Sequence, residues 1–281
     1  MRKIDLHLHS TLSDGTDTPE EILQLIRNQK IDVFSVTDHD SIAACRRIRR
    51  VLSDDDPVLI NGVEFSCRDE SGKYHILGYG YRPDGKMICD LAGKTHQMRM
   101  EKARGRLKVL KVKYGYSFSD EDIKKLLSLD NPGKPHIGNL MVQYGYASSK
   151  DEAIENVLDH IHVHTGSIMP EEAILAIRES GGLAILAHPP FGNGSQFITG
   201  ERMKERILRL KNLGLDGLET WYSGYDARLR EEMKDYADRY DLLATAGSDY
   251  HGSNKKVKIG ETGLEDADAD VRVRAFLRRC I

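Results

Sequence analysis

Residues 4–15 read IDLHLHSTLSDG: two histidines separated by one leucine, with an aspartate five residues after the second. In an extended strand, side chains alternate between two faces, so the aliphatic residues share one face while Asp5, His7 and His9 share the other. Two imidazoles one strand period apart can reach a single cation without any bend in the backbone. A half-exposed strand with histidines on its polar face fits the same letters, so the rest of the chain has to decide between the two interpretations.

The composition sets the broad class of the protein. A chain of 281 residues with 40% hydrophobic and 30% charged residues suits one large α/β domain or a domain that carries an insertion. The formal net charge of −3, from 41 basic and 44 acidic residues, gives no global attraction to long duplex nucleic acid or to an anionic membrane. No apolar run reaches the ~18 residues of a membrane span. Four scattered cysteines without a C-x-x-C pair, and a first segment without an apolar leader, predict a cytoplasmic protein with reduced thiols.

Strand-like and helix-like segments alternate in the first and last parts of the sequence. The stretch TPEE at 18–21 is a capping box that begins a helix, with Pro19 at its first position. This β-α-β-α rhythm predicts a parallel sheet, closed or open. The predicted strands after the first are IDVFSV at 31–36, VLINGVEF at 58–65, YHILGYGY at 74–81, LAILAH at 183–188, GLDGLETWY at 214–222 and DLLATAGSDYH at 241–251.

The rhythm breaks between residues 84 and 165, where the pattern is helical. A second capping box, SKDE at 149–152, begins one of the predicted helices. We therefore expect residues 84–165 to form an inserted helical cap subdomain, and residues 1–83 and 166–281 to form the catalytic domain. The apolar stripe of the insertion steps by three and four residues along Met100, Ala103, Leu107, Leu110 and Tyr114.

Side chains of the types that bind metals fall at or near the ends of several predicted strands. In a barrel of parallel strands the carboxyl ends open on one face, where active sites lie. Imidazole and carboxylate donors without thiolates suit zinc, manganese or iron. Nine donors are too many for one ion, so we expect two or three. The predicted ligands are His7, His9, Asp14, His39, Glu64, His75, His188, Asp249 and His251.

A further histidine pattern, HIHVH at 160–164, has the same alternation as the opening stretch. It lies at the end of the insertion, beside no carboxylate and outside the rhythm of strands and helices. We interpret it as a linker strand that returns to the barrel, and not as part of the metal site.

Six motifs, in order, resemble the polymerase and histidinol phosphatase (PHP) superfamily of metal-dependent phosphoesterases. They are DLHLHSTLSDGTDTPEE, VTDHD, GVEFS, HILGYGY, LAHP and GSDYHG, and they span residues 4–80 and 167–263. The resemblance implies an α/β fold, a distorted seven-stranded (β/α)7 barrel, that holds up to three divalent ions. It also implies hydrolysis by a metal-activated hydroxide. Asp249 is our candidate for orienting that hydroxide, and the sequence assigns no general acid.

Carried over position by position, the resemblance implies three ligand sets. Some family members have histidine at the position of Asp14, and aspartate there resembles the branch that hydrolyses small nucleotides. Asp38 and Asp40, which flank His39, are expected to support the ligands or to cap a helix. The implied sets are His7, His9, Glu64 and Asp249; Glu64 as a bridge, with His75 and His188; and Asp14, His39 and His251.

The same branch carries a helical insertion whose basic groups face substrate phosphate, in a segment that often reads Arg-Pro-His-Ile-Ala-Arg. Here the segment reads KPHIGN, so Lys134 and His136 keep a cationic role while Asn139 replaces an arginine. Residues 94–113 add eight Lys or Arg against one acid, a local charge of +7. This stretch is either the solvated face of a helix or a cationic wall beside the metals. We expect Arg99, Lys134 and His136 to contact the part of the substrate that is not hydrolysed.

Three residues at the end of the strand GLDGLETWY also reach toward the predicted active face: Glu219, Trp221 and Tyr222. Trp221, the only tryptophan of the chain, can stack on a nucleobase. Core packing is the favoured interpretation for a lone tryptophan of this kind.

The leading functional hypothesis is a phosphatase that hydrolyses a phosphate monoester of a nucleotide or a similar small molecule. The alternatives are a 5′-3′ exoribonuclease on short RNA, a histidinol-phosphate-type phosphatase, and a metal-binding regulatory domain without activity. The net charge argues mildly against a long nucleic-acid track. The insertion argues against histidinol phosphate, and a complete ligand set argues against an inactive domain.

Overall fold

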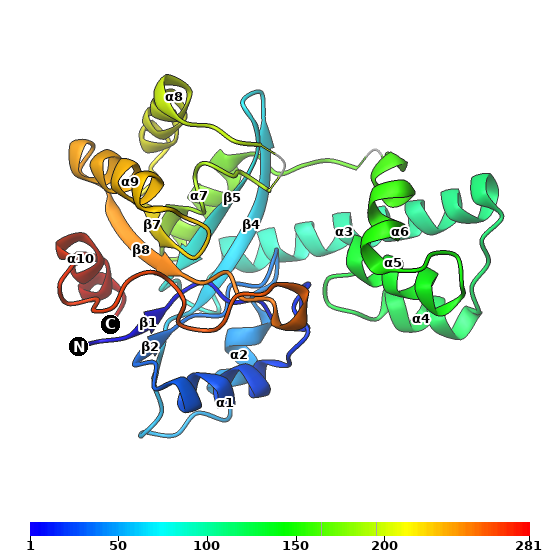
Figure 1. The fold of residues 1–281 in the computed structure, drawn as a ribbon, viewed down its shortest axis with the longest axis horizontal. Helices are drawn as coiled ribbons and strands as arrows, with labels where there is room; N and C mark the ends of the chain where they lie inside the picture. Colours follow the sequence, from blue (N-terminus) through cyan, green and yellow to red (C-terminus); the bar gives the residue numbers. More distant parts are fainter. Residues whose placement is uncertain (164, 195) are drawn as a thin grey trace.

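The computed structural model describes residues 1–163, 165–194 and 196–281. Its strands are β1 (Ile4–Asp5), β2 (Val33–Phe34), β3 (Val58–Leu59), β4 (Gly62–Asp69), β5 (Gly72–Tyr79), β6 (Leu183–Leu186), β7 (Gly217–Tyr222) and β8 (Leu243–Gly247). They form two sheets in one body, with a lobe of helices beside it (Figure 1). The smaller sheet has the order β1-β2-β3 and is parallel. The larger has the order β4-β5-β6-β7-β8, antiparallel from β4 to β6 and parallel from β6 to β8.

The two sheets do not close into the barrel that the sequence predicted. Isolated parallel bridges, Leu8 with Tyr250 and His39 with Glu64, join the sheets where a barrel would continue its ladders. Each strand of the smaller sheet is two residues long, which is too short for a continuous ladder around a barrel. The α/β class is confirmed, whereas the closed (β/α)7 form is not.

The predicted strand at 58–65 splits into β3 and β4, which belong to different sheets. At the split, the side chain of Asn61 donates a hydrogen bond to the carbonyl of Tyr81 at 2.9 Å and ties the chain to the end of β5. The next predicted strand pairs antiparallel with β4, because only residues 70 and 71 separate the two strands. A connection of that length makes a hairpin, whereas a parallel crossover needs about a dozen residues or more.

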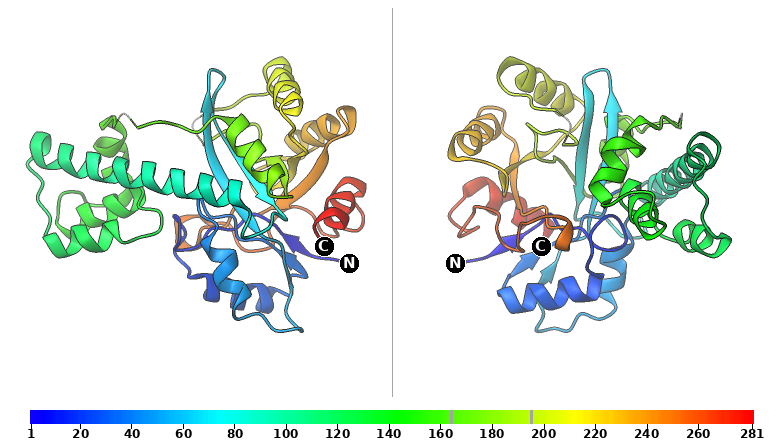
Figure 2. Two further views of the ribbon diagram at one scale, coloured as in Figure 1. Left: turned by 180° about the vertical axis from the view of Figure 1, so that it is seen from behind. Right: turned by 45° about the vertical axis from the view of Figure 1, so that its right-hand side comes forward.

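Helices of the body cover the outer faces of the two sheets (Figure 2). The predicted capping box begins the first of them: the Thr18 hydroxyl accepts from the Glu21 amide at 3.2 Å, and the Glu21 carboxylate accepts from the Thr18 amide at 2.7 Å. These helices are α1 (Pro19–Gln29), α2 (Ala43–Arg49), α7 (Pro170–Glu179), α8 (Gly200–Asn212), α9 (Ala227–Arg239) and α10 (Val271–Cys280). The short 3₁₀ helix η2 (Gly252–Asn254) follows β8 and contacts the lobe through Asn254 and Lys150.

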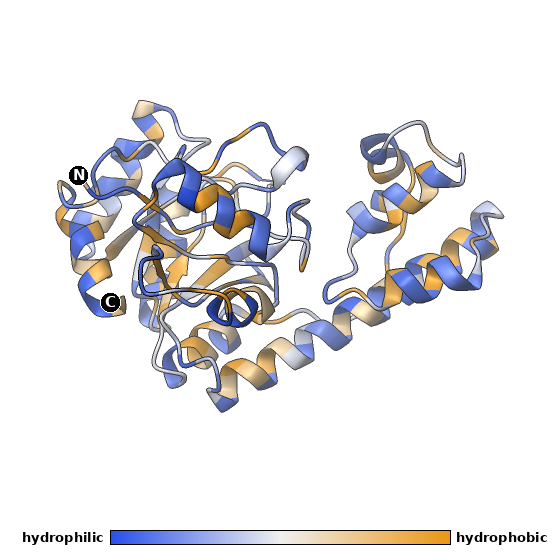
Figure 3. Cartoon of the chain, turned by 90° about the horizontal axis from the view of Figure 1, so that it is seen from below, coloured by the Kyte–Doolittle hydropathy of each residue, from blue (hydrophilic) through white to orange (hydrophobic). Residues whose placement is uncertain are grey.

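The lobe consists of α3 (Lys86–Tyr114), α4 (Asp120–Leu127), α5 (Lys134–Gln143), α6 (Lys150–Asn156) and the 3₁₀ helix η1 (Leu158–His160). Helix α3 joins it to the body, as Figure 3 shows from below. At the start of α3, Ile88 and Leu91 are buried in the core of the body. Farther along, Ala103, Leu107 and Leu110 are buried in a separate core of the lobe, as the predicted stripe requires. The domain boundaries at 84 and 165 stay a prediction.

Two finer predictions for the lobe are wrong in part. Ser149 caps α6 by accepting from the Glu152 amide at 3.1 Å, but the Glu152 carboxylate binds the Ser148 amide, so only half of the capping box forms. The HIHVH stretch forms no strand over residues 160–163, and His164 lies outside the described residues. Ile161 is buried in the core of the lobe, which holds this segment to helices and not to a sheet.

None of the helices in the described ranges combines the length and the apolar character needed to cross a membrane.

Candidate metal centre

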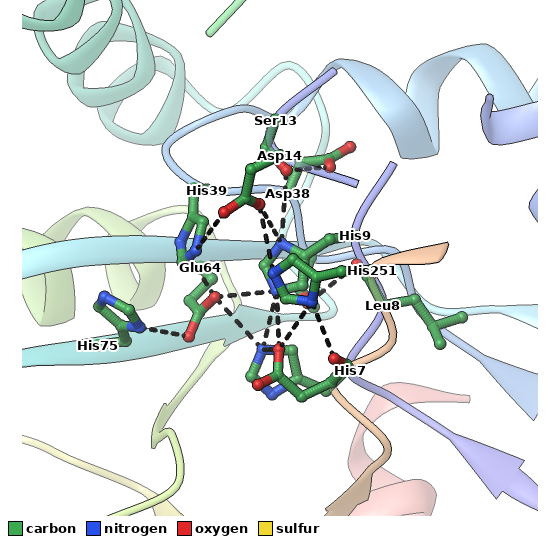
Figure 4. Close-up of polar contacts among 12 residues, drawn as sticks. His7, Leu8, His9, Ser13, Asp14, Asp38, His39, Glu64, His75 and His251 are labelled. Carbon is green, nitrogen blue, oxygen red and sulfur yellow. Dashed lines mark hydrogen bonds and ion pairs between the residues drawn. The ribbon is translucent and has the colours of Figure 1, made fainter. Parts of the chain in front are cut away.

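The opening stretch places its histidines as its alternation predicts. Leu6 and Leu8 are buried in the hydrophobic cores, and His7 and His9 are buried on the other side of the chain. Nε2 of His7 lies 3.1 Å from Nε2 of His9, so the two rings point to one place (Figure 4). This geometry fits two ligands of one cation.

Glu64, on β4, lies in the middle of the cluster and is only 1% exposed (Figure 4). Five imidazoles from four segments approach its two oxygens, which suits a carboxylate that bridges ions. Oε2 lies 3.3 Å from Nε2 of His7, 3.1 Å from Nε2 of His9 and 3.1 Å from Nδ1 of His39, while Oε1 lies 2.8 Å from Nδ1 of His75 and 3.1 Å from Nε2 of His188.

Asp14 draws a second group of donors together. Its Oδ1 lies 3.3 Å from Nε2 of His251 and 3.7 Å from Nδ1 of His9, and its Oδ2 lies 3.8 Å from Nε2 of His39. The Asp14 side chain is 29% exposed, whereas that of Glu64 is 1% exposed. The Asp14 group therefore forms the more open part of the cluster.

Asp249 and His188 reach the cluster from the ends of β8 and β6. Oδ1 of Asp249 lies 3.5 Å from Nε2 of His7 and 3.3 Å from Nε2 of His9. Its Oδ2 accepts a hydrogen bond from the Tyr222 hydroxyl at 2.8 Å and binds the Lys255 ammonium. The backbone φ is 57° at Asp249 and 25° at His188. Positive φ is strained for residues with a side chain, and such strain gathers at functional sites.

The structure brings all nine predicted ligands into one cluster, although their roles as metal ligands stay a prediction. The grouping differs from the implied sets in three ways. His9 joins the Asp14 group, Glu64 is absent from the set of His7, His9 and Asp249, and His188 and His75 approach Glu64 in separate sets that also contain His7 and His39. His160 and His162 belong to none of the sets among the described residues. The sets with donor atoms within 4.8 Å of one another are His9, Asp14, His39 and His251; His7, His9 and Asp249; His7, Glu64 and His188; and His39, Glu64 and His75.

Burial and mutual contact shift the pKa values in the cluster. Burial opposes charge on His9, but the carboxylates of Asp249 and Glu64 outweigh it and raise the pKa of His9 to about 9. Burial also opposes ionisation of Glu64, yet the histidines around it hold its pKa well below the usual range. For Asp14 and Asp249, too, burial opposes ionisation, but the histidines beside them lower the pKa well below the usual range. The buried carboxylates therefore stay ionised and attract positive charge.

Several donor atoms of the cluster are buried without a hydrogen-bond partner. Unpaired buried polar atoms cost free energy unless a ligand satisfies them. Nitrogen and oxygen donors without a thiolate are those that zinc, manganese and iron accept. The residues therefore fit a site for more than one divalent ion. The unpaired atoms are Oδ1 of Asp14, Nδ1 of His39, Oε2 of Glu64, Nδ1 of His75 and Nδ1 of His188.

Comparison with known proteins identifies the family. The sequence profile of the PHP domain matches residues 5–168, which is more than half of the chain. The chain belongs to the PHP family of metal-dependent phosphoesterases.

Curated relatives align over nearly the whole PHP chain. A phosphoribosyl 1,2-cyclic phosphate 1,2-diphosphodiesterase of Eggerthella lenta is 29% identical over 267 residues, which cover 90% of this chain and 95% of that protein. A 5′-3′ exoribonuclease of Haemophilus influenzae is 28% identical, with 92% and 94% covered. A 3′,5′-nucleoside bisphosphate phosphatase of Chromobacterium violaceum is 26% identical, with 89% and 88% covered.

Solved structures share the fold. A Bifidobacterium adolescentis protein described as a metal-dependent phosphoesterase has a TM-score of 0.84 at 26% identity, with 100% of this chain and 97% of that one covered. A Chromobacterium violaceum protein described as an amidohydrolase, with bound sulfate and no metal, has a TM-score of 0.78 at 25% identity, with 91% and 90% covered. The α/β architecture is therefore that of PHP phosphoesterases.

Asp38 supports the PHP site through the loop that carries Asp14. Its carboxylate accepts from the amide of Ser10 at 2.7 Å, the hydroxyl of Ser10 at 2.6 Å and the hydroxyl of Ser13 at 2.5 Å. Asp38 thereby fixes the segment between His9 and Asp14, which is the supporting role expected from its place beside His39. Asp40 instead pairs with Arg99 and accepts from the Ser66 amide at 2.9 Å.

Glu219, the third residue of β7, contacts two of the nine donor residues, and the ligand prediction left it out. Nδ1 of His7 donates to its Oε1 at 2.9 Å, and the amide of His188 donates to its Oε2 at 2.7 Å. Gly247 makes room for this contact, since a Cβ there would lie 2.2 Å from Cβ of His7 and 2.5 Å from Oε1 of Glu219. The signal in the sequence was a carboxylate near the end of a predicted strand, as at Glu64, although in the structure both carboxylates lie at the third residue of their strands.

The PHP site opens into two clefts. The basic cleft, with a volume of about 390 Å³, runs from Asp14, His39 and His75 to the face of α3 and the start of α5. The aromatic cleft, about 360 Å³, runs from His188, Asp249 and His251 past Phe191 and Tyr222 to α6. Asp14, His39 and His75 border both clefts, so the metal cluster lies where they meet.

The predicted substrate contacts lie at different places around the basic cleft. Arg99 lines it but pairs with Asp40, with Nε at 2.7 Å from Oδ2. Lys134 lines it and pairs with Asp159. His136 is not among its lining residues, and its Nδ1 accepts from the Gly133 amide at 3.1 Å. Substrate contact by these three residues stays a prediction.

Two cations that the sequence analysis did not single out line the same cleft: Lys102 and Arg106. They follow Arg99 at steps of three and four residues, which places the three on one face of α3. Nε of Arg106 is buried without a hydrogen-bond partner. The interpretation of residues 94–113 as a cationic wall therefore fits the α3 face that carries Arg99, Lys102 and Arg106. The interpretation as a solvated surface fits the remaining basic residues of the stretch, which are exposed.

Trp221 lines neither cleft. Its indole Nε1 donates to Asp270 at 2.8 Å, and its ring packs against a core cluster of the body. The guanidinium of Arg230 lies 5.1 Å from the ring centroid. These contacts favour the packing interpretation over base stacking.

Proposed function

We propose that this protein is a metal-dependent phosphatase that hydrolyses a phosphate monoester of a nucleotide or a similar small molecule. The proposal is carried by one observation: nine nitrogen- and oxygen-donor side chains converge where two clefts with lysines and arginines in their walls meet. Basic walls attract anionic esters. Cleft volumes of about 390 and 360 Å³ suit small ligands and leave no room for a long duplex.

The nine donors would hold two or three divalent ions of manganese, iron or zinc. Bound ions of this kind lower the pKa of water and neutralise phosphate oxygens as charge develops. Glu64 is the proposed bridging ligand because histidines surround both of its oxygens. His9 belongs both to the Asp14 group and to the set with His7 and Asp249. An ion held by the Asp14 group would therefore lie next to an ion held by His7 and Asp249.

Residues of the chain itself would position the reacting groups. Tyr222 and Lys255 hold Oδ2 of Asp249, which leaves Oδ1 directed at His7 and His9. A carboxylate held in this way is suited to orient a water molecule toward the phosphorus atom. The Lys255 ammonium borders the aromatic cleft and can contact a phosphate oxygen.

The helical lobe would act as the cap of the site, with 84–165 as its boundaries. Thr95 donates to the Asp40 carbonyl at 3.2 Å and Asn131 binds the His39 carbonyl, so the lobe is docked beside the proposed ligands. Arg99, Lys102 and Arg106 then present cations toward the part of the substrate that is not hydrolysed.

A second candidate is a phosphodiesterase, such as a 5′-3′ exoribonuclease on short RNA. Clefts extend from the cluster in two directions, so a phosphate at the metals can carry a substituent on each side. The Eggerthella lenta and Haemophilus influenzae relatives, named as a diphosphodiesterase and an exoribonuclease, make this candidate worth testing.

Phosphate release from a panel of esters tests the proposal. The panel contains a nucleoside 5′-monophosphate, a nucleoside 3′,5′-bisphosphate, histidinol phosphate, a cyclic ribose phosphate and a short 5′-phosphorylated RNA. The protein is loaded with manganese, and Glu64→Gln is compared with Glu205→Gln, the same change at an exposed position of α8. We expect release from a mononucleotide that Glu64→Gln loses and Glu205→Gln keeps.

Other outcomes assign the other functions. Shortening of the RNA or opening of the cyclic ester, with little release from mononucleotides, would favour the diesterase. Selective release from histidinol phosphate would favour that phosphatase. Silence across the panel with metals bound would contradict both hydrolase proposals and favour a regulatory domain.

A further inference from the structure

The aromatic cleft has a wall of two rings, of which Phe191 has no part in the proposed chemistry and Tyr222 takes part only through its hydroxyl. Phe191 and Tyr222 line it, and the ring centroid of Tyr222 lies 5.4 Å from that of His188, so the wall adjoins the ligand cluster. The volume of about 360 Å³ falls in the range of small-molecule sites, roughly 300–1,000 Å³. Such sites are mostly apolar with a few polar groups.

The wall is held in place from behind. The ring of Tyr222 is fixed at its hydroxyl by Asp249, at 2.8 Å, and packs on Tyr225 with centroids 5.2 Å apart. Phe191 lies 5.9 Å from Tyr222 and 5.8 Å from Tyr225. Tyr225 is buried, whereas Phe191 and Tyr222 are only partly buried. The two cleft-lining rings are therefore preorganised and still accessible.

Cations border the same cleft. The Lys255 ammonium binds Asp249 beside the cluster. The Lys150 ammonium donates to the neutral side chain of Asn254 at 2.6 Å, and Asp151, 4.0 Å away, is 80% exposed. A ligand in this cleft thus meets aromatic rings and ammonium groups together, which is the combination that a base and its phosphates require.

We propose that the aromatic cleft is a nucleobase subsite in which Phe191 is the stacking residue and Tyr222 forms the adjoining wall. This inference rests on the proposed function and narrows its substrate class to nucleotides, as against phosphorylated sugars without a base. Every base has a π-face, so a stacking wall tolerates different bases. Phe191 takes the role that the sequence allowed for Trp221, which lines neither cleft.

Adenosine tests the subsite without any phosphate chemistry. We would titrate it into the manganese-loaded wild type and into Phe191→Leu, Phe191→Tyr and Phe197→Leu. Phe197 belongs to the same ring cluster, 5.9 Å from Phe191, but is 63% exposed and outside the cleft lining. We expect Phe191→Leu to weaken binding about tenfold, the effect of losing one base stack, and Phe191→Tyr to restore it. Phe197→Leu should bind as the wild type does.

Phosphate release adds a second measurement. The ratio of kcat/KM for adenosine 5′-monophosphate to that for ribose 5-phosphate should fall about tenfold in Phe191→Leu. No adenosine binding by the wild type, or equal binding by Phe191→Leu, would overturn the subsite. Equal kcat/KM values for adenosine 5′-monophosphate and ribose 5-phosphate in the wild type would overturn the subsite but would still support the phosphatase proposal. Adenosine binding that needs the ring at 191, without any phosphate release, would support the subsite and reject the phosphatase.

Discussion

Glu219 accepts a hydrogen bond from Nδ1 of His7 at 2.9 Å and so turns Nε2 of that ring toward the cluster. Its other oxygen accepts from the amide of His188 at 2.7 Å, at a residue with φ of 25°. One buried carboxylate therefore fixes a ring at one proposed ligand and the strained backbone at another. Carboxylates in this position orient histidine ligands and increase their basicity.

Glu219→Gln should weaken metal binding about 10- to 100-fold with little change of fold. Two donors need two acceptor oxygens, and an amide supplies only one, so the variant must lose the contact with His7 or with His188. Metal affinity, measured by chelator competition, is the readout.

Glu205→Gln, on the exposed side of α8, is the matched control. Equal affinities for the two variants would show that Glu219 has no positioning role. A large drop in melting temperature for the metal-free Glu219→Gln protein would point to folding as its main contribution.

Metal affinity should increase with pH up to about 9. In the metal-free protein the pKa of His9 is raised to about 9, so at neutral pH a metal must displace its proton. Each displaced proton gives ~10-fold in affinity per pH unit, and His7, whose pKa nearby carboxylates also raise well above its usual value despite burial, adds to the slope from His9. Zinc affinities measured between pH 6.5 and 8.5, in chelator buffers, test this slope, and a flat profile would contradict it.

The stability of the metal-free protein should change in the opposite direction. A raised histidine pKa adds stability that is fully present below the unfolded value of ~6.5 and is lost as pH rises through about 9. The titration of His9 should therefore lower the melting temperature of metal-free protein between pH 6.5 and 9. Metal-loaded protein, in which His9 is neutral at every pH of this range, should lack this contribution.

The convergence of the nine donor side chains could be predicted from the sequence because most of its signals are local. Alternation in IDLHLH fixes the side on which His7 and His9 lie, and the strand end before His188 places that residue without knowledge of the partner strand. Glu64 lies inside β4, so the strand end predicted beside it did not place it. The capping box at Thr18 is likewise contained in four residues.

The parts that failed depend on pairing between distant segments. Nothing within 58–65 shows that β3 and β4 join different sheets, since that depends on partners elsewhere in the chain. The antiparallel turn before Gly72 did have a local signal, a short polar stretch with glycine, which the sequence-based prediction of a β-α-β order left out. The pairing of Arg99 with Asp40 joins residues 59 apart and has no local signature.

Arg99→Lys should raise KM for the substrate about tenfold. Arg99 holds Asp40 through Nε and Nη2 and also donates to the Ser66 hydroxyl at 3.1 Å, and lysine, as a single point charge, cannot reproduce this fork. Steady-state kinetics on the substrate found in the ester panel would measure it. Arg104→Lys, at an exposed position of α3, is the control, and the same KM in both variants would exclude Arg99 from the substrate site.

Thr18→Ala should lower the free energy of unfolding by about 1 kcal/mol, because it removes the side-chain acceptor of the α1 capping box. Thr199 is the natural control, since it occupies the N-cap of α8 but its side chain makes no capping bond. Urea unfolding of Thr18→Ala and Thr199→Ala should show a clear loss only in the first. Equal losses of unfolding free energy in the two variants would mean that the replacement of threonine by alanine, and not the loss of the capping hydrogen bond, causes the destabilisation.

Asn254→Ala should weaken binding at the Asp14 group selectively. The Asn254 amide donates to the Asp14 carbonyl at 2.7 Å, while its oxygen accepts from Lys150 on α6 at 2.6 Å, so it ties both the Asp14 loop and the lobe to the body. Lys150→Met removes only the second contact and separates the two effects. We expect the weakest-bound ion to lose about tenfold in affinity in Asn254→Ala, with the tighter ions retained. Equal loss in Lys150→Met would mean that docking of the lobe, and not the Asp14 loop, holds this ion. Uniform loss of all ions in Asn254→Ala would show that the cluster behaves as one unit.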